Sequence, residues 1–142
     1  MKNLVYGQDE RVRDWVAERI GENLDDANTA IGIEEDGELI AGVAYNMYTG
    51  AAICMNVAAT PGKRWTSKEF MYAFFAYPFV QLKCRRVTGL VRASNSVARK
   101  FDEHVGFIQE GVLREAFEDG EDAILYGMLK SECRFIKKEH LK

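Results

Sequence analysis

Residues 95–111 read Asn-Ser-Val-Ala-Arg-Lys-Phe-Asp-Glu-His-Val-Gly-Phe-Ile-Gln-Glu-Gly, and this stretch decides the fold. It follows residues 86–93, whose composition is typical of a strand. Asn95 is a favoured helix N-cap, and Gly106 is typical of the residue that ends a helix. The apolar residues between them recur at helical spacing: Val97, Ala98, Phe101 and Val105. The stretch therefore predicts a strand, a helix and a second strand in immediate succession.

The segments before this stretch predict more strands and helices. Strands are expected at residues 4–6, 29–35, 38–48 and 51–59, with Asp36-Gly37 as a hairpin turn. A first helix is expected to be capped by Asp9 and stopped by Gly21. A second helix is expected from Thr66 or Ser67 to about Leu82, with a kink or early stop at Pro78.

The segments after it predict a closing hairpin. Residues 106–118 read as an extended arm with a bulge at Gly111, and residues 122–130 pair back on it. Residues 131–142 read as a charged C-terminal tail. The element order β-α-β-β-β-α-β-α-β-β predicts one α+β domain over residues 1–142, with a mixed central sheet of about six to seven strands and helices on both faces.

Composition limits the class of protein. The chain has 142 residues, 47% of them hydrophobic and 11% aromatic, which fits one domain with a real core and excludes a disordered chain. No run resembles a membrane span or a secretory signal, so a cytoplasmic protein is expected. Three widely separated cysteines (Cys54, Cys84 and Cys133) and two histidines predict reduced thiols and no metal site.

The charges are distributed unevenly along the chain. Residues 1–60 hold four Lys/Arg against 11 Asp/Glu, residues 61–100 hold nine against one, and residues 101–142 hold six against ten. A local cationic zone attracts an anion such as a nucleotide, a phosphorylated cofactor or nucleic acid, although a solvated helix and strand face has the same composition. The acidic flanks argue against nonspecific nucleic-acid binding, which prefers a continuous basic face.

The segment after residues 51–59 has the composition of a phosphate site. A strand, a tight loop and a helix N-terminus follow one another at residues 57–67, and Lys63, Arg64 and Lys68 add positive charge. Free backbone N–H groups and the helix dipole at such a turn favour an anion. The sequence therefore predicts that this turn binds phosphate.

The element order, together with Asn-x-x-Ala, Gly-Phe and Glu-Gly in residues 95–111, resembles the C-terminal half of the GCN5-related N-acetyltransferases. The resemblance is greatest to the branch that acetylates ribosomal-protein N-termini, and it extends to diverged domains encoded by tailed phages. It implies the acyl-CoA N-acyltransferase fold, acetyl-CoA as co-substrate, an amine acceptor, and a homodimer through the final strands.

The resemblance also implies where the coenzyme binds. The pyrophosphate would lie on a loop formed by Gly62, Lys63, Arg64, Trp65, Thr66 and Ser67. The pantetheine arm would pair with Val57 and Ala59, and Asn95 and Arg99 would contact the coenzyme. Trp65 and Ser67 stand where the family has glycines. From the residues alone, Asn95 is also a helix cap, a role compatible with coenzyme contact. Arg99 is equally a solvent-facing residue, and Val57 and Ala59 are equally packing positions under a helix.

The family's acid and base are replaced. In the ribosomal-protein branch a Ser three residues after the Asn protonates the thiolate, and a Glu ten residues after the Phe of Gly-Phe is the base. The corresponding residues here are Ala98 and Phe117. Weak substitutes exist, and their catalytic roles stay open: Ser94, Ser96, Tyr126 and Glu115.

Acyl transfer without these groups is feasible for a weakly basic amine. At pH 7 roughly 10% of an α-amino group is neutral, against roughly 0.04% of a lysine side chain. The sequence therefore predicts an acetyl-CoA-dependent N-acetyltransferase that acts on a primary amine, either a protein N-terminus or a small molecule, by direct attack. The alternative is a catalytically degenerate domain of the same fold that binds coenzyme A or serves as a phage structural or interaction protein.

Overall fold

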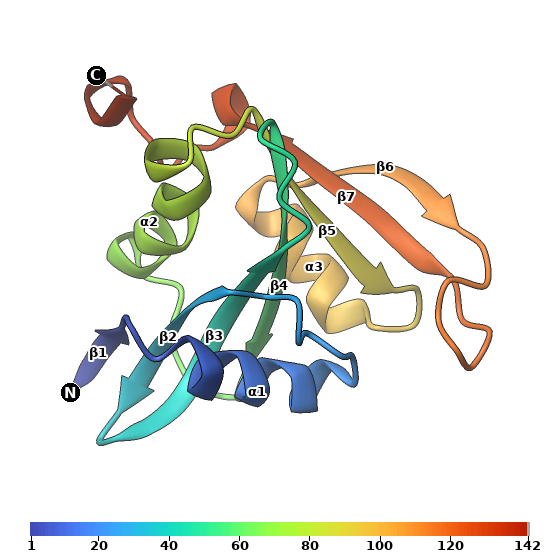
Figure 1. Ribbon diagram of the computed structural model, residues 1–142, viewed down its shortest axis with the longest axis horizontal. Coiled ribbons are helices and arrows are strands. Elements are labelled where there is room, and N and C mark those ends of the chain that lie inside the picture. The colour runs from blue at the N-terminus through green and yellow to red at the C-terminus, as the bar shows by residue number, and fades with distance from the viewer. Residues whose placement is uncertain (142) are drawn as a thin grey trace.

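A seven-stranded mixed sheet organises the chain, in the order β1-β2-β3-β4-β5-β7-β6 (Figure 1). The computed structural model describes residues 1–141. The strands are β1 (Lys2–Val5), β2 (Thr29–Glu35), β3 (Glu38–Asn46), β4 (Ala52–Ala59), β5 (Arg86–Arg92), β6 (Ile108–Leu113) and β7 (Ala123–Leu129). The helices are α1 (Asp9–Ile20), α2 (Lys68–Ala76) and α3 (Ser96–Val105). β4 and β5 pair in parallel, and the other neighbours pair antiparallel.

The helices cover both faces of the sheet. On one face, α1 packs over β2–β4 through Val12 and Val16. Gly42 of β3 permits this close approach, since a Cβ there would lie 2.9 Å from Val12 Cγ1 and 3.0 Å from Val16 Cγ2. On the other face, α2 and α3 share one continuous core whose largest members include Phe74 and Tyr126. The predicted fold class, element order and two-sided helical cover are therefore confirmed.

Several local predictions are confirmed by the backbone and by capping hydrogen bonds. Asp36 and Gly37 form the β2–β3 turn with φ values of 53° and 85°. The Ser67 hydroxyl accepts the Phe70 N–H at the start of α2, and Asn95 Oδ1 accepts the Ala98 N–H at the start of α3. The glycines that follow α1 and α3 are left-handed, as the sequence predicts.

The prediction that Asp9 caps the first helix is wrong. Gln8 occupies the N-cap position and makes no side-chain cap, and Asp9 is the first residue of α1. Its Oδ1 accepts the Ala30 N–H at 2.9 Å. Asp9 therefore ties the start of α1 to β2 instead of satisfying its own helix.

The second helix ends earlier than the apolar spacing predicts. α2 stops at Ala76 and continues as a π-helical turn, η1 (Tyr77–Gln81). Pro78 lies in this turn and lacks the N–H that would extend the α-helical ladder, so the early stop expected there is confirmed.

The charged tail folds back onto the main core and α2. Two 3₁₀ turns, η2 (Lys130–Glu132) and η3 (Lys138–Leu141), shape it, and Cys133 and Ile136 are buried in the main core. Apolar side chains spaced between charges thus anchor the segment. Lys142 lies outside the described residues.

Candidate active site

The central irregularity of the sheet is a divergence of β4 and β5. The two strands pair only at Ala52–Cys54 and Arg86–Thr88, although β4 continues to Ala59 and β5 to Arg92. Figure 1 shows the two arrowheads well apart. Beyond Cys54, the edge of β4 that faces β5 has no strand partner among residues 1–141, so its backbone polar groups can bond an extended ligand.

The loop that leaves β4 leads to the N-terminus of α2. Ser67 uses its side chain on Phe70, and its carbonyl accepts the Met71 N–H. The N–H groups of Lys68 and Glu69 have no acceptor among residues 1–141, as expected for a first helical turn. These two donors and the helix dipole form a site suited to an anion.

The basic residues of the loop do not act as a group. Lys63 Nζ bonds Glu35 Oε1 at 2.8 Å, so its charge is directed to the β2–β3 hairpin. Arg64 and Lys68 are exposed and make no ion pair within the described chain. Gly62 is left-handed with φ 81°, and Thr66 is exposed. The loop therefore brings two free cations to the α2 N-terminus.

Trp65 bridges α2 and α3. Its ring centroid lies 4.9 Å from that of Phe101 on α3 and 5.9 Å from that of Phe74 on α2. The ring is partly buried and packs against the main core together with Val57 and Ala59 of β4. In this conformation the indole fills space between the two helices, beside the part of β4 that no longer pairs with β5.

Asn95 and Arg99 both make hydrogen bonds within the protein. Asn95 Oδ1 is used as the α3 cap. Arg99 lies over the sheet and donates to the Ala93 carbonyl at 3.1 Å, to the Tyr126 hydroxyl at 3.3 Å and to Gln109 Oε1 at 3.5 Å. The Arg99 guanidinium is therefore neither solvent-facing nor free for a phosphate in this arrangement.

The four weak catalytic candidates do not converge. Tyr126 is fully buried, and its hydroxyl donates to Glu103 Oε2 at 2.7 Å. Ser94 Oγ donates to Glu121 Oε1 at 2.5 Å, and Ser96 is the exposed first residue of α3. Glu115 is exposed in the turn after β6, with φ 51°.

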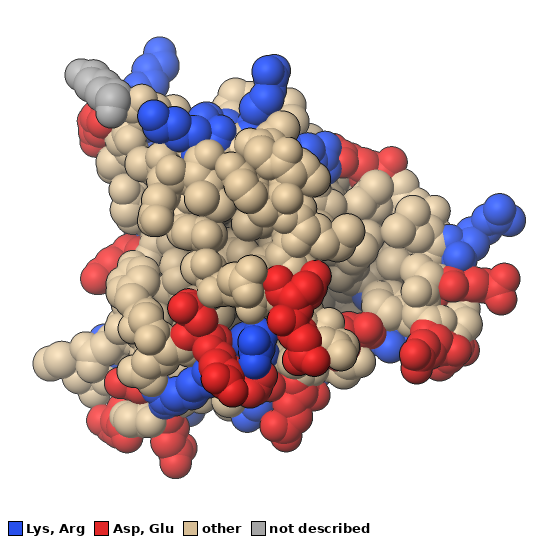
Figure 2. Space-filling view, in the orientation of Figure 1, with Lys and Arg blue, Asp and Glu red and all other residues tan. Residues whose placement is uncertain are grey.

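An acidic group surrounds Arg92 at the end of β5. Its guanidinium contacts Glu22 at 3.0 Å and Asp119 at 2.8 Å, and lies 4.1 Å from the ring centroid of Phe117. Glu121 completes the group at 3.6 Å. The pKa of Glu121 is lowered, first by its hydrogen bonds from Ser94 and then by Arg92. These contacts join the α1–β2 and β6–β7 loops, and Figure 2 shows acidic side chains around both regions.

These ion pairs also show where part of the positive charge of residues 61–100 is neutralised. Arg92 and Lys63 are neutralised by carboxylates from other segments, and Arg86 pairs with Glu110 at 2.6 Å. Three of the nine cations in residues 61–100 are thus neutralised in different places, which weakens the basic zone that nucleic acid would require.

Asp102 is not among the site residues predicted from the sequence. It lies on the side of α3 that faces β5, where a Cβ on Gly89 would be 3.5 Å from Asp102 Oδ2. Burial raises the pKa of Asp102 to about 7, and the charge of Glu103 adds to the effect. A signal was present: Asp102 interrupts the apolar stripe formed by Ala98, Phe101 and Val105.

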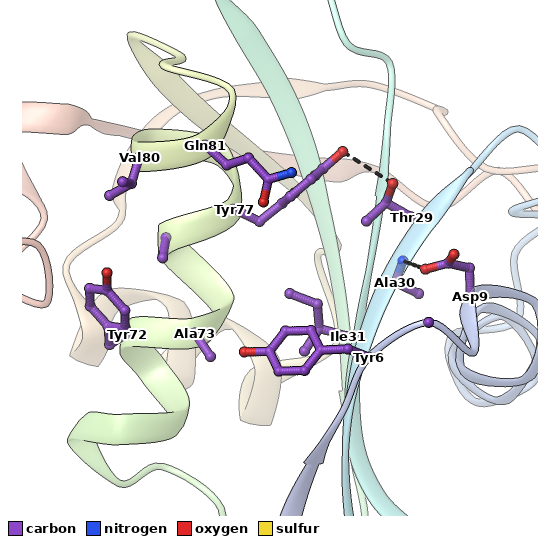
Figure 3. Close-up of a pocket in the computed structure, with 12 residues that line it drawn as sticks. Tyr6, Asp9, Thr29, Ala30, Ile31, Tyr72, Ala73, Tyr77, Val80 and Gln81 are labelled. Carbon is purple, nitrogen blue, oxygen red and sulfur yellow. Dashed lines mark hydrogen bonds between the residues drawn. The ribbon is translucent and has the colours of Figure 1, made fainter. Parts of the chain in front are cut away.

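A separate cavity of about 430 Å³ lies between β1–β2 and the other side of α2. Figure 3 shows Tyr6, Tyr72 and Tyr77 around it, with the Tyr77 hydroxyl donating to Thr29 Oγ1 at 3.1 Å. Phe74, which faces Trp65, does not line it. This cavity is therefore distinct from the β4–β5 divergence.

Two further observations concern the described residues. Within residues 1–141, no helix combines the length and apolar character needed to cross a bilayer. The same part of the chain contains no cluster of three or more His, Cys, Asp or Glu side chains placed to hold a metal ion.

The architecture is that of the GCN5-related N-acetyltransferases. A spermidine N-acetyltransferase SpeG mutant from Vibrio cholerae matches with a TM-score of 0.72 at 18% identity, over 97% of this chain and 98% of that one. A dodecameric form of that enzyme matches with a TM-score of 0.72 at 17% identity, over 92% and 94%. These likenesses show the fold.

Other solved structures match over a smaller share of their length. A protein from T. thermophilus, provisionally described as an acetyltransferase, matches with a TM-score of 0.62 at 25% identity over 73% of this chain. The chain spans 60% of that protein and 62% of another protein described in similar terms. No family model matches the chain, and no curated protein matches it by sequence.

Proposed function

We propose that this protein is an N-acetyltransferase that transfers the acetyl group of acetyl-CoA to a primary amine by direct attack. The divergence of β4 and β5 carries the proposal, because it leaves a strand edge free on β4, and the loop after β4 leads to a helix N-terminus with two unbonded N–H groups. An extended amide-containing arm and an anionic end are the two features that such a site accommodates. Coenzyme A has both.

The chain offers distinct groups for each part of the co-substrate. The N–H groups of Lys68 and Glu69, with the side chains of Arg64 and Lys68, would bind the pyrophosphate. The backbone of Val57 and Ala59 would pair with the pantetheine arm. Trp65 fits less well, since its ring bridges the helices that flank the arm. Binding therefore requires the Trp65 side chain to turn away.

Asn95 and Arg99 have more limited roles in this proposal. Asn95 Oδ1 already caps α3, so only its amide nitrogen remains for the coenzyme. Arg99 is held by Ala93 and Tyr126, and reaching a phosphate would break both contacts. We therefore assign the phosphate contacts to the α2 end of the site.

The acceptor class follows from the ionisation of amines. The attacking nitrogen must be neutral, and an α-amine is neutral roughly 300 times more often than a lysine side chain at pH 7, equivalent to ~3.4 kcal/mol. The carboxylates around Arg92 would favour a cationic acceptor on approach. A protein N-terminus satisfies both conditions, as in the ribosomal-protein branch, whereas the strongly basic amines of a small polyamine satisfy only the second.

Isothermal titration calorimetry with acetyl-CoA tests the first half of the proposal. Charge reversal at Lys68 (Lys68→Glu) should weaken binding about tenfold, equivalent to ~1.4 kcal/mol. Lys83→Glu is the matched control, because Lys83 is an exposed cation in the loop after η1, far along the chain from the loop. Absence of wild-type binding at high micromolar concentration would refute the proposal.

Thiol release from acetyl-CoA with spermidine and with N-terminal peptides tests the second half. Turnover with any amine removes the degenerate alternative, whereas binding without turnover across the panel supports it. The acetyltransferase neighbours do not favour that alternative.

Assembly and location are also proposals. β6 is an edge strand with exposed Ile108, Val112 and Leu113, which supports a homodimer through the final strands. Light scattering that returns only the monomer mass would refute it. Three free cysteines support a reducing, cytoplasmic location.

A further inference from the structure

Asp102 lies at the apex of the β4–β5 divergence. Thr88 is the last residue of β5 that pairs with β4, and Gly89 is the next one. Asp102 Oδ2 lies 3.5 Å from the position that a Gly89 Cβ would take. The missing side chain of Gly89 leaves room for the carboxyl group at the point where the two strands separate.

The Asp102 side chain has no hydrogen bond or ion pair within residues 1–141. On α3, Glu103 is the charge that acts on Asp102, and both Glu103 and Arg99 are engaged with the hydroxyl of Tyr126 from β7. On β5, Arg86 and Arg92 alternate with Gly89 and so lie on the opposite sheet face, bound to carboxylates there. Phe74 and Trp65, from α2 and its preceding loop, are uncharged.

These surroundings keep Asp102 able to carry a proton near neutral pH. Burial disfavours its charged form, and no cation in the described part of the chain offsets that cost. The resulting pKa of about 7 is suited to proton transfer, since a catalytic acid works best with a pKa near the operating pH. Tyr126 cannot take this role without losing its bond to Glu103.

The proposed co-substrate would present its sulfur to this carboxyl group. An arm that leaves the α2 N-terminus and pairs first with Ala59 and then with Val57 runs toward the junction of β4 and β5. Two more strand residues, at ~3.3 Å each, reach Met55 beside that junction. The thioester end and Asp102 therefore meet at the apex.

We propose that Asp102 is the general acid of the acetyl transfer, an inference that depends on the proposed function. The amine nitrogen attacks the thioester carbonyl carbon, an N–C bond forms, and the C–S bond breaks. Asp102 gives its proton to the departing sulfur, which leaves as the thiol. The proton lost by the amine nitrogen passes through water and restores Asp102.

The test compares the pH dependence of kcat/KM in Asp102→Asn and the wild-type protein, with an acceptor amine that stays neutral throughout the range. The wild type should lose activity as pH rises above about 7. Asp102→Asn should be slower by about 10²- to 10⁴-fold and should lack that alkaline decline. Asp102→Glu should restore most of the rate. Glu103→Gln, the matched control, should keep the rate at low pH and should keep the decline, moved to lower pH because the charge of Glu103 helps to raise the pKa of Asp102.

Two measurements separate this inference from the proposed function. Acetyl-CoA should bind Asp102→Asn as tightly as wild type by calorimetry, with an unchanged circular dichroism spectrum. Carbon NMR of the Asp102 carboxyl group should show titration near pH 7. Turnover by Asp102→Asn at the wild-type rate, or titration near pH 4, would overturn the role of Asp102 alone. Absence of wild-type turnover with every amine would overturn both.

Discussion

Replacing Asp102 by Asn should make the protein more stable at neutral pH, and this perturbation isolates the cost of a buried charge. The amide has nearly the shape of the carboxyl group but cannot ionise. In the folded protein burial raises the pKa of Asp102 from 3.8 to about 7. The folded state therefore binds this proton more tightly than the unfolded chain does, and stability falls as pH rises between these two values.

The magnitude follows from the two pKa values. Each tenfold change in proton affinity is worth about 1.4 kcal/mol, so holding Asp102 ionised costs the folded state up to about 4 kcal/mol above pH 7. The side chain keeps partial contact with solvent, which screens the charge, so we expect about half of this, ~2 kcal/mol. Below pH 3.8 Asp102 is neutral in the folded and the unfolded wild-type protein, so the pH-dependent difference in stability between wild type and Asp102→Asn should vanish.

Urea unfolding of the two proteins between pH 4 and pH 8.5 measures this difference. The other carboxylates titrate in both proteins, so subtracting the two free energies of unfolding leaves the contribution of position 102. Asp102→Asn should gain ~2 kcal/mol relative to wild type as pH rises through this window. A difference that stays constant with pH, or a variant that is less stable at pH 8, would refute the reasoning.

Three further perturbations probe the site. Ser67→Ala removes the α2 cap and should lower the free energy of unfolding by about 1 kcal/mol in urea titrations, whereas the exposed Thr66→Ala should change it little. Trp65→Ala removes a partly buried ring, so thermal denaturation should show a loss of about 2 kcal/mol, while calorimetry should show tighter acetyl-CoA binding because the inter-helix space opens. Unchanged binding would assign Trp65 to packing alone. Arg92→Gln should lower the midpoint of thermal unfolding at low ionic strength and should lower it less in 1 M salt, since its partners are partly exposed carboxylates.

The fold could be predicted because its signals are local. Hydrophobic periodicity gave the order of strands and helices, and the caps at Ser67 and Asn95 depend on residues three positions away. Asp36-Gly37 gave the hairpin for the same reason. The prediction for Asp9 was wrong because its hydrogen-bond partner is not local: Asp9 bonds Ala30, which lies on β2.

The candidate site could be predicted only in outline. The sequence shows a strand, a basic loop and a helix start after one another at this site. It does not show which way each cationic side chain points. Lys63 is bound to Glu35, and Arg92 to Glu22, which lies 70 residues away. No spacing rule connects such pairs. The divergence of β4 and β5 likewise involves strands from different parts of the chain, and no local spacing marks where their pairing ends.

Ala98 and Asp102 belong to one argument about the proton. Residues four apart on a helix share a face, one turn or ~6 Å along the axis. The resemblance places the usual proton donor at Ala98, where a methyl group cannot serve, and the structure places an unpaired carboxyl group one turn later, on the side that faces Gly89. A donor shifted by one turn along α3 still faces the opening between β4 and β5. The alanine at position 98 therefore does not by itself exclude acid catalysis in this fold, because the helix that lacks the expected hydroxyl carries another acid on the same face.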